Sequence, residues 1–402
     1  MEIQVSDCLS RRRTSNKGRG KTHRLRTGFL IGFCLGTAFL FSSQASGQGP
    51  LYRLGSVSEN QNLRGPLQPP AQSEPGVWLV EKDIRLHYQS QGRGRPVLVV
   101  HGGPGVPYSK PWAGLESLKE DFQFYDYHQR GCGESSRPIQ RLHGSFLENA
   151  TALERTLGVG AQIADIERIR RILNQEKLLL IGHSYGGFLA TLYAAEFPNR
   201  VEKLILVAPA GVLSPPDKQR NLFEQTRNRL PSEDRPEFDS LLRKYFDFGS
   251  LFQKSDQELA ALHQEVGRFV LQAMGYPEQP EPAKAKVGGW AVFALYFSTG
   301  MTGDFTPALS RIQAPTLILY GEDDTMSLAG VESYRGIPGS TLTAVAREPG
   351  GGRAGHFLFE DCPQTFGRLA GTFLKEASKP TESRKSQAAS KAGTLSSAVK
   401  KP

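Results

Sequence analysis

The 402-residue chain is predicted to adopt an α/β fold built on a mostly parallel central sheet. From residue 77 onward, short apolar runs alternate with segments of helical periodicity, which is the pattern of strands separated by packed helices. The runs at 96–100 (PVLVV) and 315–320 (PTLILY) are continuous and apolar, as expected of strands buried on both faces. With 38% hydrophobic and 22% charged residues, the composition excludes a fibrous or wholly disordered protein.

The order of the apolar runs predicts each element in turn. Residues 77–80 and 84–88 are expected to form an antiparallel pair that opens the sheet. Apolar residues at helical spacing over 163–173 predict a helix whose charged residues lie on the opposite face. Further strands are expected at 96–100, 122–127, 178–181, 204–207, 315–320 and, from a weaker pattern, 342–345.

The interval 212–305 departs from this alternation. It is rich in charge, carries Phe and Leu at helical spacing and lacks β-branched runs. We therefore expect a helical lid insertion between two core segments, 76–211 and 306–376.

The net charge of +9 is concentrated at the two ends of the chain. Residues 1–27 carry a net +6 and residues 375–402 a net +5, which leaves −2 for the 347 residues between them. The folded part is therefore expected to be nearly neutral, so nucleic-acid binding by the core is not expected. Composition also predicts a linker over 48–75 and a disordered basic tail over 377–402.

Residues 1–47 have the pattern of an export or anchoring signal. Basic residues from Arg11 to Arg26 precede an apolar run at 28–41, and small polar residues follow, as at a signal-peptidase site. Because no charge occurs between Arg26 and Arg53, an uncleaved membrane anchor is the alternative to a cleaved signal peptide. Either version keeps the basic flank in the cytoplasm. The protein is therefore expected to be exported (periplasmic or secreted), or membrane-anchored with its catalytic domain outside the cytoplasm.

Four cysteines are too few for a disulfide scaffold in a chain of this length. Cys8 and Cys34 lie in the signal region, whereas Cys132 and Cys362 belong to the expected core. The second pair is expected either to form one bridge in an oxidising compartment or to remain as two buried thiols. Neither has the spacing of a metal ligand, and no metal or other cofactor is expected.

A candidate nucleophile lies in the sequence GHSYGG at 182–187. It follows the apolar run KLLLI and precedes a segment of helical pattern, so it has the strand, sharp turn and helix of a nucleophile elbow. Such a turn exposes the Ser184 hydroxyl at a helix N-terminus. Gly182 and Gly186 are required because Cβ atoms there would clash in so tight a turn.

A serine nucleophile needs a base and an orienting carboxylate, which follow it in this order along the chain: serine, acid, histidine. The loop GEDD after 315–320 holds the acid, for which we select Asp324 and keep Asp323 as the alternative. His356, at the end of a glycine-rich loop, is the predicted base because it is the one histidine downstream of the acid. His183 is expected to point away from the serine hydroxyl.

The motif HGGPG at 101–105 directly follows the apolar run 96–100. Acyl transfer requires backbone N–H groups directed at a developing oxyanion, and small residues allow that close approach. We expect Gly103 and Tyr185 to supply these donors as the oxyanion hole. A phosphate-binding loop at this position is excluded because the segment around 101–105 matches neither of the usual glycine-rich phosphate signatures.

Together these motifs resemble the proline iminopeptidase family of α/β-hydrolases. The resemblance rests on HGGPG at 101–105, RGCGES at 130–135, DIERIR at 165–170 and GHSYGG at 182–187, and covers about residues 77–375. It implies an α/β-hydrolase fold and cofactor-free hydrolysis of small amides or esters through an acyl-enzyme, often with release of an N-terminal residue. Carried over, it makes Ser184 the nucleophile and Asp324 the orienting acid. His356 becomes the base and Gly103 an oxyanion donor.

Several positions depart from the family pattern. His128 stands where the family usually has an aspartate, and His183 and Tyr185 in the elbow are common in general esterases. Trp290 lacks an accompanying glutamate of the kind that holds a substrate α-ammonium. The acidic residues of the insertion are expected on solvated helix faces: Glu224, Glu233, Glu237 and Glu258.

The sequence therefore predicts a serine hydrolase, with an aminopeptidase that releases N-terminal residues as the first expectation. A carboxylesterase or other small-acyl hydrolase is the alternative. Epoxide hydrolases and dehalogenases are disfavoured because they have aspartate at the nucleophile position, and a non-catalytic binding domain is disfavoured by the complete serine, acid and histidine set. The expected partner is a small peptide, amide or ester substrate, with membrane attachment only through the N-terminal segment and no oligomeric state predicted.

Overall fold

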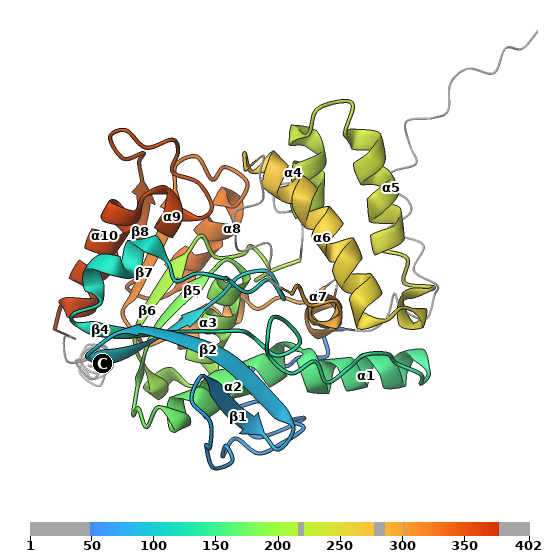
Figure 1. The fold of residues 1–402 in the computed structure, drawn as a ribbon, viewed down its shortest axis with the longest axis horizontal. Coiled ribbons are helices and arrows are strands. Elements are labelled where there is room, and N and C mark those ends of the chain that lie inside the picture. Colours follow the sequence, from blue (N-terminus) through green and yellow to red (C-terminus); the bar gives the residue numbers. More distant parts are fainter. Residues whose placement is uncertain (1–48, 216–220, 277–285, 301, 378–402) are drawn as a thin grey trace, which may run out of the picture.

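The computed structural model describes residues 49–215, 221–276, 286–300 and 302–377 (Figure 1). The predicted signal or anchor at 1–47 and nearly all of the predicted tail at 377–402 lie outside the described residues. Within the described ranges, no helix has the length and apolar character needed to cross a membrane.

In the described part of the chain, the strands form one eight-stranded sheet in the order β1-β2-β4-β3-β5-β6-β7-β8. The strands are β1 (Val77–Glu81), β2 (Ile84–Gly92), β3 (Arg95–Val100), β4 (Phe122–Tyr127), β5 (Leu178–His183), β6 (Val201–Val207), β7 (Thr316–Gly321) and β8 (Thr341–Val345). β2 pairs antiparallel with β1 and β4, and every other pairing from β4 to β8 is parallel. The predicted opening pair and the mostly parallel sheet are both confirmed.

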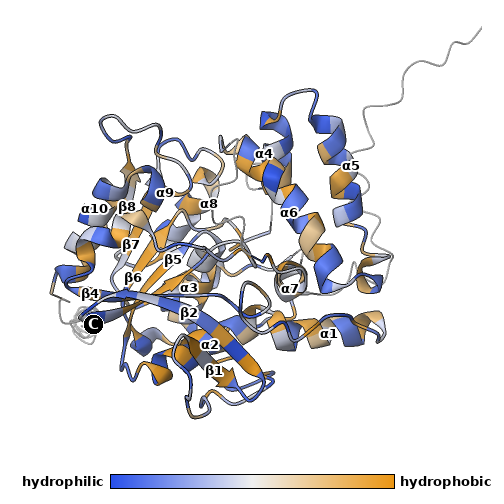
Figure 2. Ribbon diagram, viewed as in Figure 1, coloured by the Kyte–Doolittle hydropathy of each residue, from blue (hydrophilic) through white to orange (hydrophobic). Residues whose placement is uncertain are grey.

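Helices cover both faces of this sheet (Figure 1). On one face lie α2 (Val159–Ile172) and α3 (Tyr185–Glu196), and on the other lie η1 (Ala113–Leu118), α9 (Leu358–Asp361) and α10 (Pro363–Lys375). The other elements outside the insertion are α8 (Leu328–Glu332), η2 (Pro198–Arg200), η5 (Thr306–Arg311), η6 (Ser333–Gly336) and α1 (Phe146–Leu157), whose buried leucines pack in the apolar cluster of the insertion. Figure 2 shows hydrophobic residues concentrated along β5, β6 and β7, as expected of strands covered on both faces.

Between β6 and η5 the chain forms a helical insertion. Its described elements are α4 (Leu222–Arg229), α5 (Arg235–Tyr245), η3 (Leu251–Gln253), α6 (Asp256–Ala273) and α7 (Trp290–Thr299). These helices share a separate apolar cluster that includes Phe238, Phe269 and Trp290. The insertion is helical, as its residue pattern predicts, and its role as a lid stays a prediction.

Residues 49–75, for which composition predicts a linker, contain neither helix nor strand but are packed against the core. Tyr52 and Val57 are buried in the apolar cluster around α2 and α3. Glu196 at the end of α3 accepts hydrogen bonds from the Tyr52 hydroxyl at 2.8 Å and from the Gly55 amide at 2.7 Å. This segment is therefore part of the folded core rather than a free connection.

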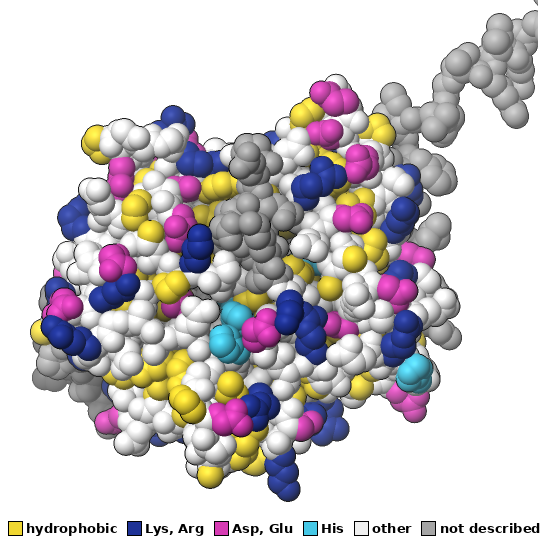
Figure 3. Space-filling model, viewed as in Figure 1, with side chains coloured by type: hydrophobic (Ala, Val, Ile, Leu, Met, Phe, Trp, Pro, Cys, Tyr) yellow, Lys and Arg dark blue, Asp and Glu magenta, His cyan; other side chains and the backbone are white. Residues whose placement is uncertain are grey.

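Charges of both signs are distributed over the folded part. On the face shown in Figure 3, Lys and Arg side chains alternate with Asp and Glu rather than gathering in one basic patch. This distribution agrees with the nearly neutral core that the sequence predicts.

Candidate active site

Ser184 occupies a strained turn between β5 and α3. Its backbone has φ 53° and ψ −120°, which is rare for a non-glycine residue. A Cβ at Gly182 would lie 2.5 Å from the Gly186 carbonyl oxygen, and a Cβ at Gly186 would overlap the carbonyl oxygen of Val100. The glycines therefore allow the turn to close, and Ser184 is the partly exposed residue of an otherwise buried segment.

Asp324 and His356 are brought together above the ends of β7 and β8. His356 Nδ1 lies 2.8 Å from Asp324 Oδ2, and both residues are buried. Burial alone would raise the pKa of Asp324, but the His356 ring and Ser327 hold it below its ordinary value. The carboxylate is therefore anionic at neutral pH, and it can fix Nδ1 of the imidazole as the protonated nitrogen.

Asp323, the alternative acid, points elsewhere. Its carboxylate forms a bidentate pair with Arg347, both distances being 2.7 Å, and accepts the Ala354 amide at 2.8 Å. The carboxylate that contacts His356 is therefore Asp324, while Asp323 holds the backbone of the loop that leads to His356. Among the described residues, no hydrogen bond joins Ser184 Oγ to the His356 ring; such contacts are often long without substrate.

The HGGPG loop runs beside the nucleophile. A Cβ at Gly102 would lie 3.1 Å from the Ser184 Cβ. Gly103 has φ +116°, a backbone conformation that side chains disfavour, and its peptide bond to Pro104 is cis. Tyr185 is the first residue of α3, so its amide has no acceptor within the helix. The loop and the helix start thus bring backbone amides to the Ser184 side of the sheet.

His183 connects the elbow to the loop that carries His356. Its Nε2 lies 3.0 Å from the His356 carbonyl oxygen, so this nitrogen must donate, and its Nδ1 accepts from the Tyr108 hydroxyl. Burial, followed by the neighbouring His356 ring, lowers the pKa of His183 well below its ordinary value. The neutral His183 is therefore a structural bridge, with both ring nitrogens engaged by groups other than Ser184 Oγ.

The HGGPG loop is held from below by two buried side chains. His101 Nδ1 donates to the Gly102 carbonyl at 2.7 Å, and its Nε2 accepts the Gln129 amide at 3.0 Å. The Gln129 side chain donates in turn to the His101 carbonyl at 2.8 Å. Burial lowers the pKa of His101 to about 3, which agrees with a neutral ring that donates from one nitrogen and accepts at the other.

Arg130, next to Gln129, lies at the centre of a buried ion network that it forms with Asp165, Glu81 and Arg168. It forms two hydrogen bonds to Asp165, at 2.6 and 2.5 Å, and one to Glu81 at 2.8 Å. Arg168 joins the same two carboxylates at 3.0 and 3.1 Å. Burial would raise the pKa of Glu81, but Arg130 and then Arg168 lower it to about 2. The charges of the network are thus mutually compensated.

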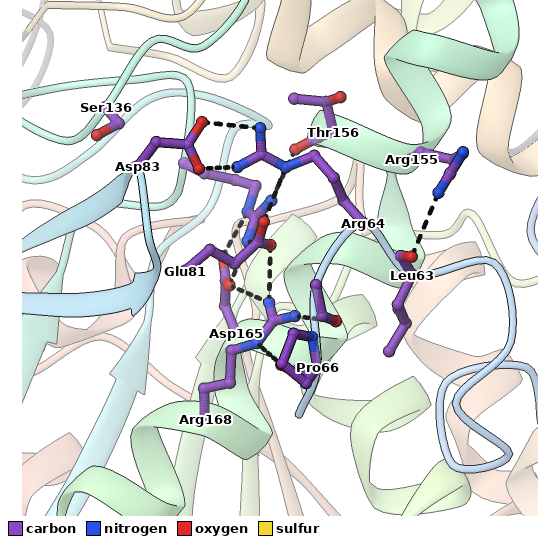
Figure 4. Close-up of polar contacts among 12 residues, drawn as sticks. Leu63, Arg64, Pro66, Glu81, Asp83, Ser136, Arg155, Thr156, Asp165 and Arg168 are labelled. Atoms are coloured by element: carbon purple, nitrogen blue, oxygen red, sulfur yellow. Dashed lines mark hydrogen bonds and ion pairs between the residues drawn. The ribbon is translucent and has the colours of Figure 1, made fainter. Parts of the chain in front are cut away.

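The N-terminal segment contacts the same network (Figure 4). Arg64 donates to Glu81 at 2.7 Å, and Arg168 donates to the carbonyl oxygens of Pro66 and Gly65, both at 2.9 Å. The segment 49–75 is therefore fixed to the sheet by charged groups as well as by apolar packing.

His128, which replaces the aspartate of the family pattern, supports the following turn. Its Nδ1 accepts the Glu134 amide at 3.0 Å, and its ring packs at 4.9 Å from that of His87. Burial lowers the pKa of His128 to about 4. The neutral imidazole thus provides the hydrogen-bond acceptor that a carboxylate would provide at this position.

The helical insertion touches both loops of the site. The Gly288 amide donates to the Gly105 carbonyl at 2.8 Å, and the half-buried His263 of α6 hydrogen-bonds the backbone of Pro104. Three of the four acidic residues predicted on solvated faces are exposed, namely Glu233, Glu237 and Glu258, whereas Glu224 is half-buried. Glu237 pairs with Arg268, and Glu258 caps the start of α6.

Two further predictions can be compared with the structure. Cys132 and Cys362 are separate buried thiols, so the second of the two alternatives holds. Trp290 is fully buried in the insertion cluster. Sequence reasoning missed the supporting contacts of Tyr108 and Gln129, for which position next to the glycine-rich motifs is the only signal in the sequence.

Comparisons with known proteins agree with this architecture. Residues 95–361 match the alpha/beta hydrolase fold family. A proline iminopeptidase of Heyndrickxia coagulans is 26% identical over 303 residues, covering 71% of this chain and 93% of the relative. A proline iminopeptidase of Saccharolobus solfataricus is 27% identical over 273 residues, covering 63% and 78% of the two chains. Epoxide hydrolase 4 of Homo sapiens is 26% identical over 323 residues, covering 75% and 79%. The chain therefore belongs to the alpha/beta hydrolase fold family.

Proposed function

We propose that the protein is a serine hydrolase that acts through an acyl-enzyme, and more specifically an aminopeptidase that releases N-terminal residues. The observation that carries the proposal is the buried hydrogen bond between His356 and Asp324 beside the strained turn at Ser184. Similarity to two proline iminopeptidases supports the narrower assignment. A serine at the elbow argues against the epoxide hydrolase chemistry named for another relative.

In the proposed mechanism, Ser184 Oγ attacks the substrate carbonyl while His356 Nε2 takes its proton. Asp324 keeps the proton of the neutral imidazole on Nδ1 and stabilises the imidazolium that forms. The amides of Gly103 and Tyr185 stabilise the oxyanion of the tetrahedral intermediate. His356 then protonates the departing amine, and water, activated by the same histidine, hydrolyses the acyl-enzyme and restores Ser184.

The helical insertion acts as the lid of this site in the proposed enzyme. Its contacts with Gly105 and Pro104 support that role, since these residues follow Gly103, the proposed oxyanion donor. A lid of this kind would admit only small substrates and would keep bulk water away from the reacting groups.

A carboxylesterase or other small-acyl hydrolase is the second candidate. It is favoured by the elbow sequence, in which His183 and Tyr185 flank the serine as in general esterases. The two candidates share the acyl-enzyme chemistry and differ in whether a free α-ammonium group is recognised.

The test uses the full chain and Ser184→Ala on three substrate sets. These are prolyl, alanyl and leucyl anilides with a free amine, the same anilides with a blocked amine, and short acyl esters. Turnover of the free-amine anilides alone, abolished by Ser184→Ala, is the expected result. Turnover of esters alone would replace the aminopeptidase with an esterase, and turnover that survives Ser184→Ala would overturn the serine mechanism.

Export, or anchoring in a membrane, is also proposed on the pattern of residues 1–47. The test is fractionation of cells that express the full chain, with N-terminal sequencing of the product. Activity outside the cytoplasmic fraction is expected, and a chain that stays in the cytoplasm would contradict export.

A further inference from the structure

The loop that leads to His356 is rich in glycine and needs external support. Gly350 has φ +77°, and a Cβ at Gly350 or Gly352 would meet no neighbouring atom within 4 Å. Glycine-rich backbone loses more conformational entropy on ordering than other sequences do. A base at the end of such a loop keeps a fixed position relative to the nucleophile only if other groups hold the adjoining backbone.

Two side chains fix the peptide groups on either side of His356. The Gly355 amide donates to Asp361 Oδ2 at 2.9 Å, and the Phe357 amide donates to the Tyr276 hydroxyl at 3.1 Å. The Tyr276 hydroxyl donates in turn to Asp361 Oδ2 at 2.5 Å. The pair formed by Tyr276 and Asp361, here called the histidine clamp, thus holds the backbone immediately before and after the imidazole.

Tyr276 reaches this position from the helical insertion. It follows the C-terminal end of α6, and its ring packs at 5.1 Å from Phe357 and 4.1 Å from the Arg353 guanidinium. Arg353 also donates to the carbonyl oxygen at Met274, at 2.5 Å. The insertion therefore contacts the His356 loop at residues directly beside the histidine, although Tyr276 and His356 are 80 positions apart in sequence.

We propose that Tyr276 is a positioning residue for His356 and that the insertion, through the histidine clamp, orients the base of the reaction. This inference rests on the proposed function and deepens it. With His183 on the His356 carbonyl, the clamp completes a set of contacts to the backbone before, at and after the residue. Loss of one contact allows the imidazole to move away from the line between Asp324 and Ser184, which slows proton transfer more than it weakens substrate binding.

The test compares Tyr276→Phe with Tyr296→Phe in the full chain. Tyr276→Phe removes the hydroxyl and keeps the ring that contacts Phe357 and Arg353. Tyr296→Phe is the matched control, because Tyr296 is also a half-buried tyrosine of the insertion but packs on Phe246 and Phe293. Two readouts are measured: kcat and KM on the best substrate, and the proton NMR resonance of His356 Nδ1–H, assigned by its loss in Asp324→Asn.

For Tyr276→Phe we expect kcat to fall about tenfold to hundredfold while KM changes little. The Nδ1 proton resonance should shift or broaden, and Tyr296→Phe should leave both readouts as in the wild type. Asp361→Asn should have a similar effect. The double variant should have a kcat no lower than that of the more impaired single variant, because both residues act on one backbone segment.

A kcat within about twofold of the wild type together with an unchanged Nδ1 resonance would overturn the proposal. A fall in kcat that Tyr296→Phe reproduces would also overturn it, because the effect would then belong to the insertion as a whole. If the wild type turns over no substrate, the proposed function fails. The Nδ1 resonance, which needs no substrate, then decides the positioning role alone.

Discussion

The elbow at Ser184 and the loop at His356 contribute to one site but are held in place by different means. The elbow depends on backbone contacts within the sheet, where Gly182 and Gly186 pack directly against neighbouring carbonyl groups. The His356 loop depends on side chains: His183 and Tyr276 come from distant parts of the chain, and Asp361 from the short helix that follows the loop. Close packing therefore fixes the nucleophile, whereas long-range hydrogen bonds fix the base.

Because of this difference, substitutions in the two regions should have different consequences for folding and for the reaction rate. Backbone packing tolerates no added atom, so changes at the elbow should affect folding and chemistry together. Hydrogen bonds from side chains can be removed one at a time, so changes around His356 should reduce the rate in steps while the fold survives.

The largest effect on catalysis is expected from Asp324→Asn. The amide can leave His356 in the wrong tautomer, and kcat should fall by about 10⁴-fold with little change in thermal stability. Steady-state kinetics checks this, with the neighbouring Asp323→Asn as control. An equal or larger fall in Asp323→Asn would show that the orienting acid is misassigned.

The largest effect on folding is expected beneath the oxyanion loop. Arg130→Met leaves Asp165 and Glu81 buried with part of their charge uncompensated, and should lower the free energy of unfolding by about 3–5 kcal/mol. Urea denaturation measures the loss. Arg347→Met, which removes an exposed partner of Asp323, should lower the free energy of unfolding far less, because solvent screens an exposed ion pair. Equal losses would contradict the expected difference between the buried ion network of Arg130 and the exposed ion pair of Arg347.

His183 links the two regions, and its removal should give an intermediate effect. His183→Ala leaves the Tyr108 hydroxyl and the His356 carbonyl without this partner in a buried site. We expect kcat to fall about tenfold to hundredfold, with a lower melting temperature. The exposed His143→Ala serves as control. A kcat unaffected by His183→Ala would mean that the His356 loop needs no support from the elbow.

The smallest expected effect is a pH dependence of the free energy of unfolding, which comes from the Asp323–Arg347 contact beside the His356 loop. Arg347, with the Ala354 amide, lowers the pKa of Asp323 to about 2 from its ordinary value of 3.8. The contact therefore stabilises the fold above pH 3.8, and this contribution is lost as the pH falls towards 2. Because solvent screens this exposed pair, its contribution to the free energy of unfolding should be small.

Urea unfolding of the wild type and Asp323→Asn at pH 5 and pH 2.5 tests this sign. The wild type should be the more stable at the higher pH, and the difference should shrink at the lower pH. A difference that grows on acidification would contradict the assigned role of Arg347.

The sequence predicts the elbow well because its constraints are local. Strand, glycine, serine and helix are consecutive, so the residues that need each other are neighbours in the printed chain. Asp324 is predicted from the loop that follows β7, and His356 is predicted because it is the one histidine downstream of that loop. The identity of the acid was left open between two adjacent aspartates, and only the three-dimensional contacts separate them.

The supporting groups could not be predicted because their partners are far apart in sequence. The phenol of Tyr276 meets the amide of Phe357 across 81 positions, and Tyr52 meets Glu196 across 144. No periodicity or motif marks such pairs. The segment 49–75 also has the composition of a linker, although its few apolar residues are sufficient to pack it against the sheet.

The central claim is that Ser184 is the activated nucleophile of this site, and covalent labelling tests it most directly. The full chain is treated with a fluorophosphonate, digested and analysed by peptide mass spectrometry, beside Ser184→Ala and Asp324→Asn. We predict one adduct, on the peptide that contains Ser184, absent in Ser184→Ala and formed much more slowly in Asp324→Asn. A folded wild-type chain that takes up no label, or takes it up on another residue, would contradict the claim.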